Sequence, residues 1–109
     1  MNSELTSTHY EGKAVLCYQV SDVPVRPAPY SSAGARYQPD SVTVTFAARS
    51  ECSTASLDLA VDSVTVFGHK LKKDGTPGLN ECAERLYNYR KDYPDWVNEL
   101  VEQAKGDLS

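Results

Sequence analysis

Residues 41–67 read SVTVTFAARSECSTASLDLAVDSVTVF, and this stretch contains two runs in which apolar and polar side chains alternate. In the first run Val42, Val44 and Phe46 are separated by threonines, and in the second run apolar residues recur through 57–67. Side chains of a strand point alternately to opposite faces, so both runs predict strands with one buried face. We therefore expect a pair of strands at the centre of the fold.

The second run changes phase at Asp62-Ser63, where its apolar residues pass from odd to even positions. A slip of one residue in an alternating pattern is what a β-bulge produces, together with a local bend of the strand. A tight turn at the same place is the alternative, and it would give two short strands instead of one bent strand.

Three stretches precede this pair. Residues 1–8 are polar and are expected to be flexible. Residues 9–20 have apolar side chains at even positions and predict a first strand. Residues 21–40 hold four prolines, which fix φ and remove backbone donors, so we expect a Pro-rich surface loop that cannot serve as a central strand.

Residues 79–90 fit two structures. Apolar side chains at 79, 82, 83 and 86 have helical spacing, and Asn80 could cap such a helix. The same residues also alternate in a way that predicts the return strand of a hairpin with 64–71, turning at Lys-Asp-Gly. The sequence leaves both interpretations open.

Residues 94–105 predict an amphipathic helix. Pro94 suits the first helical position, and Gly106 is a natural stop. One stripe of this helix is apolar and the opposite side is polar, with Trp96 as the expected anchor on the sheet. We therefore predict one α+β domain over residues 1–109, a small antiparallel sheet of three to four strands packed by a C-terminal amphipathic helix.

Composition limits the class of protein. Hydrophobic residues make up 40% of 109 residues, and no run of about 18 apolar residues predicts a membrane span. The N-terminal residues lack the basic start and apolar core of a secretory signal, so a cytoplasmic location is expected. The three cysteines form no C-x-x-C pair, and no nucleophile stands in a catalytic motif. We expect no cofactor, no metal site and no enzyme activity.

Charge is distributed unevenly along a chain of net charge −4. Residues 69–91 carry six basic and three acidic side chains, and tyrosines follow within the same segment. Basic and aromatic side chains suit contact with phosphates and bases, or with a protein surface. The candidate binding residues of this segment are Lys70, Lys72, Lys73, Arg85, Tyr87, Tyr89, Arg90 and Lys91. A second candidate surface in the Pro-rich loop consists of Arg26, Tyr30, Arg36 and Tyr37.

The segment from Val64 to Val101 carries a further pattern. A strand ends in Gly68, a basic turn follows over 72–78, and a Tyr-rich stretch leads into a Pro-x-Trp-Val-x-x-Leu-Val helix. This pattern resembles small uncharacterised proteins of actinobacteria and their phages. The resemblance implies a small cytoplasmic protein of phage or prophage origin, and it implies no activity and no site residues.

These features predict a non-enzymatic binding protein that contacts another protein or a second copy of itself. The tyrosines, the Pro-rich loop and the absence of catalytic motifs favour this function. The alternative is a nucleic-acid-binding accessory protein that uses the basic segment 69–91. Neither function involves a membrane.

Overall fold

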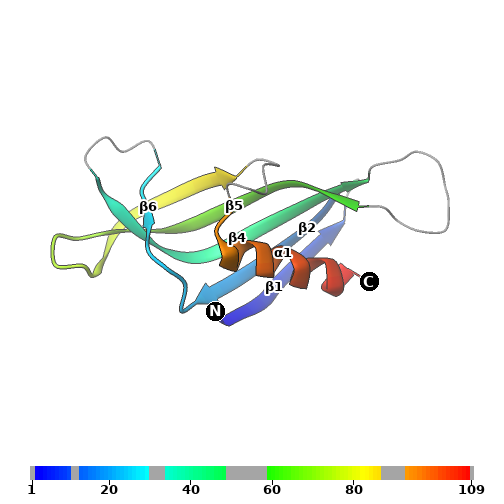
Figure 1. Ribbon diagram of the computed structural model, residues 1–109, viewed down its shortest axis with the longest axis horizontal. Coiled ribbons are helices and arrows are strands. Elements are labelled where there is room, and N and C mark those ends of the chain that lie inside the picture. Colours follow the sequence, from blue (N-terminus) through cyan, green and yellow to red (C-terminus); the bar gives the residue numbers. More distant parts are fainter. Residues whose placement is uncertain (1, 11–12, 30–33, 49–58, 87–92, 109) are drawn as a thin grey trace.

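The computed structural model describes residues 2–10, 13–29, 34–48, 59–86 and 93–108. Within them, one antiparallel sheet of six strands is packed by one C-terminal helix (Figure 1). The elements are β1 (Asn2–Tyr10), β2 (Lys13–Ser21), β3 (Arg26–Pro27), β4 (Arg36–Ala48), β5 (Leu59–Leu71), β6 (Pro77–Leu86) and α1 (Asp95–Leu108). The strand order is β1-β2-β4-β5-β6, with β3 paired to β4. The α+β prediction is confirmed in outline, but the sheet has more strands than the three to four expected.

The N-terminal expectation was wrong in two respects. Residues 2–8, expected to be flexible, belong to β1, and the single strand expected over 9–20 is divided between β1 and β2. The two strands pair antiparallel from Asn2 opposite Ser21 to Tyr10 opposite Ala14. Alternation did not reveal β1 because it is an edge strand with almost no apolar residues. Its ties are polar, such as the Ser3 hydroxyl donating to Gln103 of the helix at 2.7 Å.

The Pro-rich stretch is not one loop. It contains β3, and β4 already begins at Arg36, so Pro39 lies buried within a central strand. A register shift between Pro39 and Ser41 leaves Asp40 as an extra residue. Proline is tolerated in a sheet at such irregularities, where the ladder of hydrogen bonds is already interrupted. The prediction that 21–40 excludes a central strand was therefore wrong for 36–40.

The phase change at Asp62-Ser63 is a bulge, and the alternative of a tight turn was wrong. Thr45 lies opposite Ser63 while the next residue, Phe46, lies opposite Val61, so Asp62 is the extra residue. The bulge keeps apolar side chains on one face along a single bent strand. The central strand pair of residues 41–67 is thereby confirmed for its described part, which excludes 49–58.

Residues 79–86 form a strand, as the hairpin interpretation predicted. They belong to β6, which runs back along β5 from Leu71 opposite Pro77 to Val64 opposite Leu86. The helical alternative would have buried Leu79, whereas its side chain is 96% exposed. Residues 87–90 lie outside the described part of the chain.

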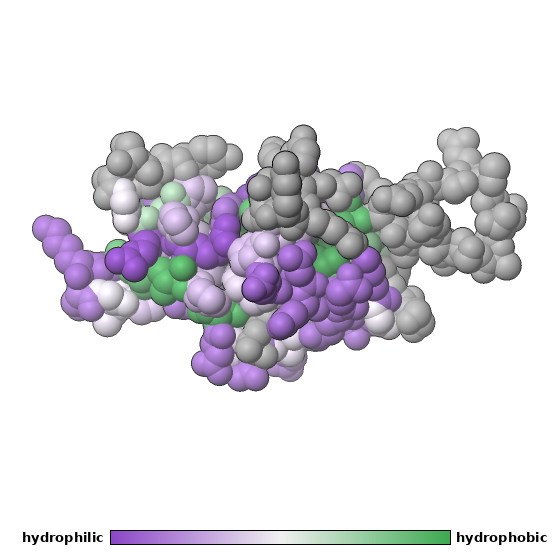
Figure 2. All heavy atoms as spheres, in the orientation of Figure 1, coloured by the Kyte–Doolittle hydropathy of each residue, from purple (hydrophilic) through white to green (hydrophobic). Residues whose placement is uncertain are grey.

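The helix α1 packs on one face of the sheet, as expected. Trp96 is 7% exposed, and Val97 and Leu100 are fully buried in the same core as β2, β4 and β5. Its opposite side is largely hydrophilic in the view of Figure 2. The helix continues past Gly106 to Leu108, because the Tyr18 hydroxyl donates to Asp107 at 2.6 Å and holds the last turn on β2. No helix in the described residues is long and apolar enough to cross a membrane.

Candidate functional site

A groove of about 550 Å³ opens at the end of the sheet where β4 begins and β5 ends. Two parts of the chain that are distant in sequence form its walls, the segment before β4 and the turn between β5 and β6. Its lining residues are Val25, Gly34, Ala35, Arg36, Leu71, Lys72, Lys73 and Gly75. The groove therefore joins part of each of the two surfaces predicted from the sequence.

The β5–β6 turn supplies the first wall. The backbone N–H of Lys72 donates to the carbonyl of Thr76 at 2.8 Å, and that of Gly75 donates to the carbonyl of Lys72 at 2.9 Å. Gly75 has a φ of 87°, a left-handed conformation that glycine adopts without strain. The Asp74 carboxylate accepts bonds from the backbone and hydroxyl of Thr76 at 3.0 and 2.6 Å. These bonds hold the positions of Lys72 and Lys73 in the turn.

The segment before β4 supplies the second wall. The backbone N–H of Ala28 donates to the carbonyl of Ala35 at 2.7 Å and closes this segment on itself. β3 then pairs with the start of β4, with Pro27 opposite Arg36. Arg36, the first residue of β4, thus becomes one of the residues that line the groove.

The electrostatics of the groove combine three cations with apolar side chains. Val25, Ala35 and Leu71 contribute the apolar part, and Val25 remains 37% exposed. The acidic residue of the turn, Asp74, is engaged by Thr76, whose hydrogen bonds hold the pKa of that carboxyl below its usual value. The groove can therefore receive a ligand that has negative charge beside an apolar group.

The structure brings together only some of the residues predicted from the sequence. Lys72, Lys73 and Arg36 line the groove, whereas Lys70 lies on β5 opposite Tyr37 and outside the lining. Arg85 lies on β6 opposite residue 65 of β5, roughly 20 Å along the strand from the groove. The other predicted side chains, Tyr30, Tyr87, Tyr89, Arg90 and Lys91, lie outside the described residues.

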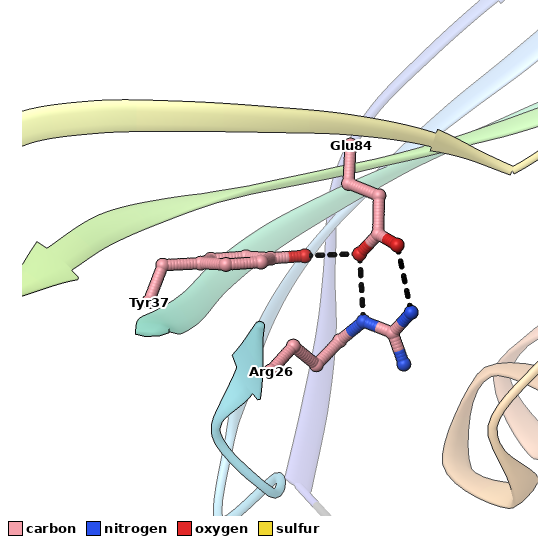
Figure 3. Close-up of polar contacts among 3 residues, drawn as sticks. All are labelled: Arg26, Tyr37 and Glu84. Carbon is pink, nitrogen blue, oxygen red and sulfur yellow. Dashed lines mark hydrogen bonds and ion pairs between the residues drawn. The ribbon is translucent and has the colours of Figure 1, made fainter. Parts of the chain in front are cut away.

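Arg26 and Tyr37 have a different role from the surface contact predicted for them. Arg26 donates from Nε and Nη2 to the two carboxylate oxygens of Glu84 at 2.7 and 2.8 Å, and the Tyr37 hydroxyl donates to the same carboxylate at 2.6 Å (Figure 3). Tyr37 is fully buried, and the side chains of Arg26 and Glu84 are 17% and 21% exposed. Because Arg26 and Tyr37 are both bound to Glu84 within the fold, a role for them in contact with a partner stays a prediction.

Gly68 explains how Tyr37 reaches across the sheet. Tyr37 lies on β4 and Glu84 on β6, so the tyrosine ring must pass over β5. A Cβ atom on Gly68 would lie 2.6 Å from the ring and 2.2 Å from the carbonyl oxygen of Gln38. Only glycine leaves room for the ring at this point.

The pKa values of the cluster follow from burial and hydrogen bonding. Burial alone would raise the pKa of Glu84, but the bonds from Arg26 and Tyr37 outweigh it and hold this pKa below its usual value. Burial, followed by the bond to Glu84, raises the pKa of Tyr37. The bond to Glu84 raises the pKa of Arg26. The cluster is thus an ion pair with a neutral tyrosine at neutral pH, and none of its groups is poised to transfer a proton there.

A second polar contact lies near the outer end of β5. His69 Nδ1 is 2.5 Å from a carboxylate oxygen of Asp40, the extra residue in β4, and its Nε2 is 3.8 Å from Glu81. The side chains are exposed by 39%, 45% and 83%. Across the described ranges, no three His, Cys, Asp or Glu side chains are grouped in a way that could hold a metal ion.

Sequence reasoning missed the apolar part of the groove and the role of Glu84. Leu71 stands between two lysines and Val25 stands in the Pro-rich stretch, and no periodicity marks either residue. A signal for Glu84 did exist, because in a strand it shares a face with Cys82 and Leu86, both of them buried. A carboxylate on such a face requires a cationic partner. This signal for Glu84 was hidden because residues 79–90 fitted a helix as well as a strand.

Comparisons with models of protein families, with curated proteins and with solved structures find no match to this chain. The geometry described above is therefore the basis of the functional proposal.

Proposed function

We propose that this protein is a non-enzymatic binding module whose groove captures an acidic, partly apolar segment of a partner protein. The single observation that carries the proposal is the convergence of Arg36, Lys72 and Lys73 on a groove that also exposes Val25, Ala35 and Leu71. Cations attract carboxylates over a distance and fix their register, whereas burial of an apolar side chain supplies most of the affinity. An extended segment with Asp or Glu beside Leu, Ile or Val satisfies both requirements.

Nucleic acid is the competing ligand for the same cations. Single strands are commonly bound by stacking of bases on aromatic rings beside a cationic track. The described lining residues include no aromatic ring, and three of the eight are aliphatic. This composition favours a protein segment over a single strand.

Fluorescence anisotropy would test the proposal with three probes. The first is a labelled peptide of alternating Glu and Leu, the second has Ser in place of every Leu, and the third is an oligothymidylate of equal charge. We expect the first peptide to bind most tightly, with an affinity that falls as salt is added. Tighter binding of the oligothymidylate would transfer the function to nucleic acid, and no binding of any probe would refute the proposal.

Two charge reversals make the test specific to the groove. K72E places a carboxylate in the lining, whereas K105E makes the same change of net charge on α1, where Lys105 contacts Glu102 at 3.2 Å. K72E should weaken peptide binding by roughly tenfold, since attraction between the groove and the acidic peptide becomes repulsion at this position. K105E should leave it within about twofold, and equal losses in both variants would mean that only total charge matters.

The biological setting stays a prediction from the sequence. A phage or prophage origin in actinobacteria would be checked by the genes beside the coding sequence. Integrase, replication or virion genes there would support it, and a housekeeping operon would contradict it.

A further inference from the structure

β6 is the terminal strand of the described sheet, on the side opposite β1 (Figure 1). Its pairing with β5 is regular from Glu81 opposite His69 to Leu86 opposite Val64. No other strand among the described residues lies on its far side. A regular terminal strand presents backbone N–H and C=O groups that can pair with a further strand.

Proteins usually protect such an edge with charged side chains, proline, a bulge, or a charge that points inward. In β6 the proline and the irregular pairing occur before residue 81. The inward carboxylate of Glu84 is neutralised by Arg26 of the same chain, and the charges of Glu81 and Arg85 on the outer face are of opposite sign. Leu79, two residues before Glu81, is 96% exposed. The edge therefore has the features of a pairing surface.

The outer face of this strand carries Glu81, Ala83 and Arg85, all exposed and evenly spaced. Opposite charges thus stand symmetrically on either side of a small residue. When a strand pairs antiparallel with a copy of itself, the two-fold axis must pass through one residue, so that residues equally far before and after it face each other.

We propose that two copies of this chain associate through β6, paired antiparallel about a two-fold axis at Ala83, to form one continuous sheet. In this register Glu81 of each copy faces Arg85 of the other, which makes two symmetry-related ion pairs. Directly opposed side chains in antiparallel strands lie about 4.5–5.5 Å apart at Cβ, so opposite charges attract effectively. Arg85 already has an interaction within its own chain, and its guanidinium has five N–H donors, so it can also bind the carboxylate of Glu81 from the other copy.

Neighbouring registers lack this complementarity. An axis at Cys82 would place Glu81 opposite Ala83, and an axis at Glu84 would bring two carboxylates together that already bind Arg26 within each copy. Opposed like charges destabilise strand pairing. Charge therefore selects Ala83 among the three centres. The association does not involve the groove, so it stands independently of the proposed function.

Sedimentation equilibrium over a concentration series would test the association. The wild-type chain should show a monomer–dimer equilibrium, and E81R and R85E should each weaken it by roughly tenfold or more, since both replace two attractions by two repulsions. An equimolar mixture of E81R and R85E should form a heterodimer, because each strand then faces one of opposite charge. Recovery in the mixture cannot come from the folding of either chain alone.

A cysteine at the centre of symmetry provides a second measurement. Opposed residues in antiparallel strands have Cα atoms about 4.5–5.5 Å apart, which is within the range for a disulfide. A83C should therefore give a covalent dimer under mild oxidation, whereas wild type and L79C, with its exposed but distant thiol, should not. A wild-type chain that stays monomeric, a mixture without heterodimer, or A83C that links no better than L79C would each overturn the proposal.

Discussion

Gly68 is the residue on which the arrangement of the basic end depends most. Its missing side chain lets the ring of Tyr37 lie across β5, and the hydroxyl of that ring then reaches Glu84 on the next strand. The requirement concerns space and not backbone conformation, because the clash would be with the ring and with the carbonyl oxygen of Gln38. Because residue 68 is glycine, side chains from β3, β4 and β6 can form one polar cluster.

G68A should therefore destabilise the fold by about 3 kcal/mol, because added atoms in a packed site force the neighbours apart. Differential scanning calorimetry would show this as a lower Tm, at roughly 4–8 °C per kcal/mol for a domain of this size. G106A is the matched control, since a Cβ there meets nothing within 4 Å. Its Tm should stay unchanged or rise slightly, because alanine favours the helix. Equal losses in both variants would contradict the role of Gly68.

At the scale of elements, the Arg26–Glu84 pair ties β3 to β6 while Tyr37 of β4 lies between them. This tie holds the segment before β4 over the sheet and so positions one wall of the groove. The bulges at Asp40 and Asp62 also help to hold the sheet together. Each of them returns apolar side chains to the buried face after a slip in register.

The tie predicts a dependence of stability on pH. The pKa of Glu84 is lowered in the folded state, so its contribution is fully present above the unfolded value of about 4.3 and is lost as pH falls through the lower folded value. E84Q should cost about 1.5–3 kcal/mol at pH 7, as expected for hydrogen bonds to a charged group. Urea unfolding of both chains at pH 7 and pH 3 would measure the difference. A difference that does not shrink at pH 3 would contradict this interpretation.

At the scale of the whole molecule, the two proposed contact regions lie apart on one sheet. The groove lies at the end of the sheet where β4 begins. The β6 edge runs along one side of the sheet (Figure 1). The net charge of −4 conceals this arrangement, because the groove gathers cations from two distant parts of the chain. No residue belongs both to the groove lining and to the regular part of the β6 edge.

Variants should therefore separate the two activities. K72E should lose binding of the Glu-Leu peptide but keep the monomer–dimer equilibrium, whereas R85E should lose dimerisation but keep peptide affinity within about twofold, because its site is roughly 20 Å away along the strand. Anisotropy and sedimentation on the same preparations would show the outcome. Loss of both activities in either variant would mean that groove and edge are coupled.

Much of the fold was predictable from the sequence alone. Alternation located β4 and β5 for the described part of 41–67, and the apolar stripe located α1 with Trp96 buried. The phase change located an irregularity at Asp62-Ser63 but left a bulge and a tight turn as alternatives, and the strand register decided for the bulge. These signals are strong because each reflects one buried face of one element. β1 gave no such signal, since an edge strand with few apolar residues is held by its neighbour and by polar ties to the helix.

The candidate site was predictable only in part. Lys72 and Lys73 were recognised as exposed cations, but their meeting with Arg36 and Val25 depends on the way β3, β4 and the β5–β6 turn come together. Arg26 and Tyr37 were assigned to the surface because a local pattern cannot reveal that Glu84, distant in sequence, would bind them. The sequence determined the elements and their buried faces, because these follow from the periodicity of neighbouring residues. Only the tertiary structure decided which charges meet, because that depends on strand order and register across the sheet.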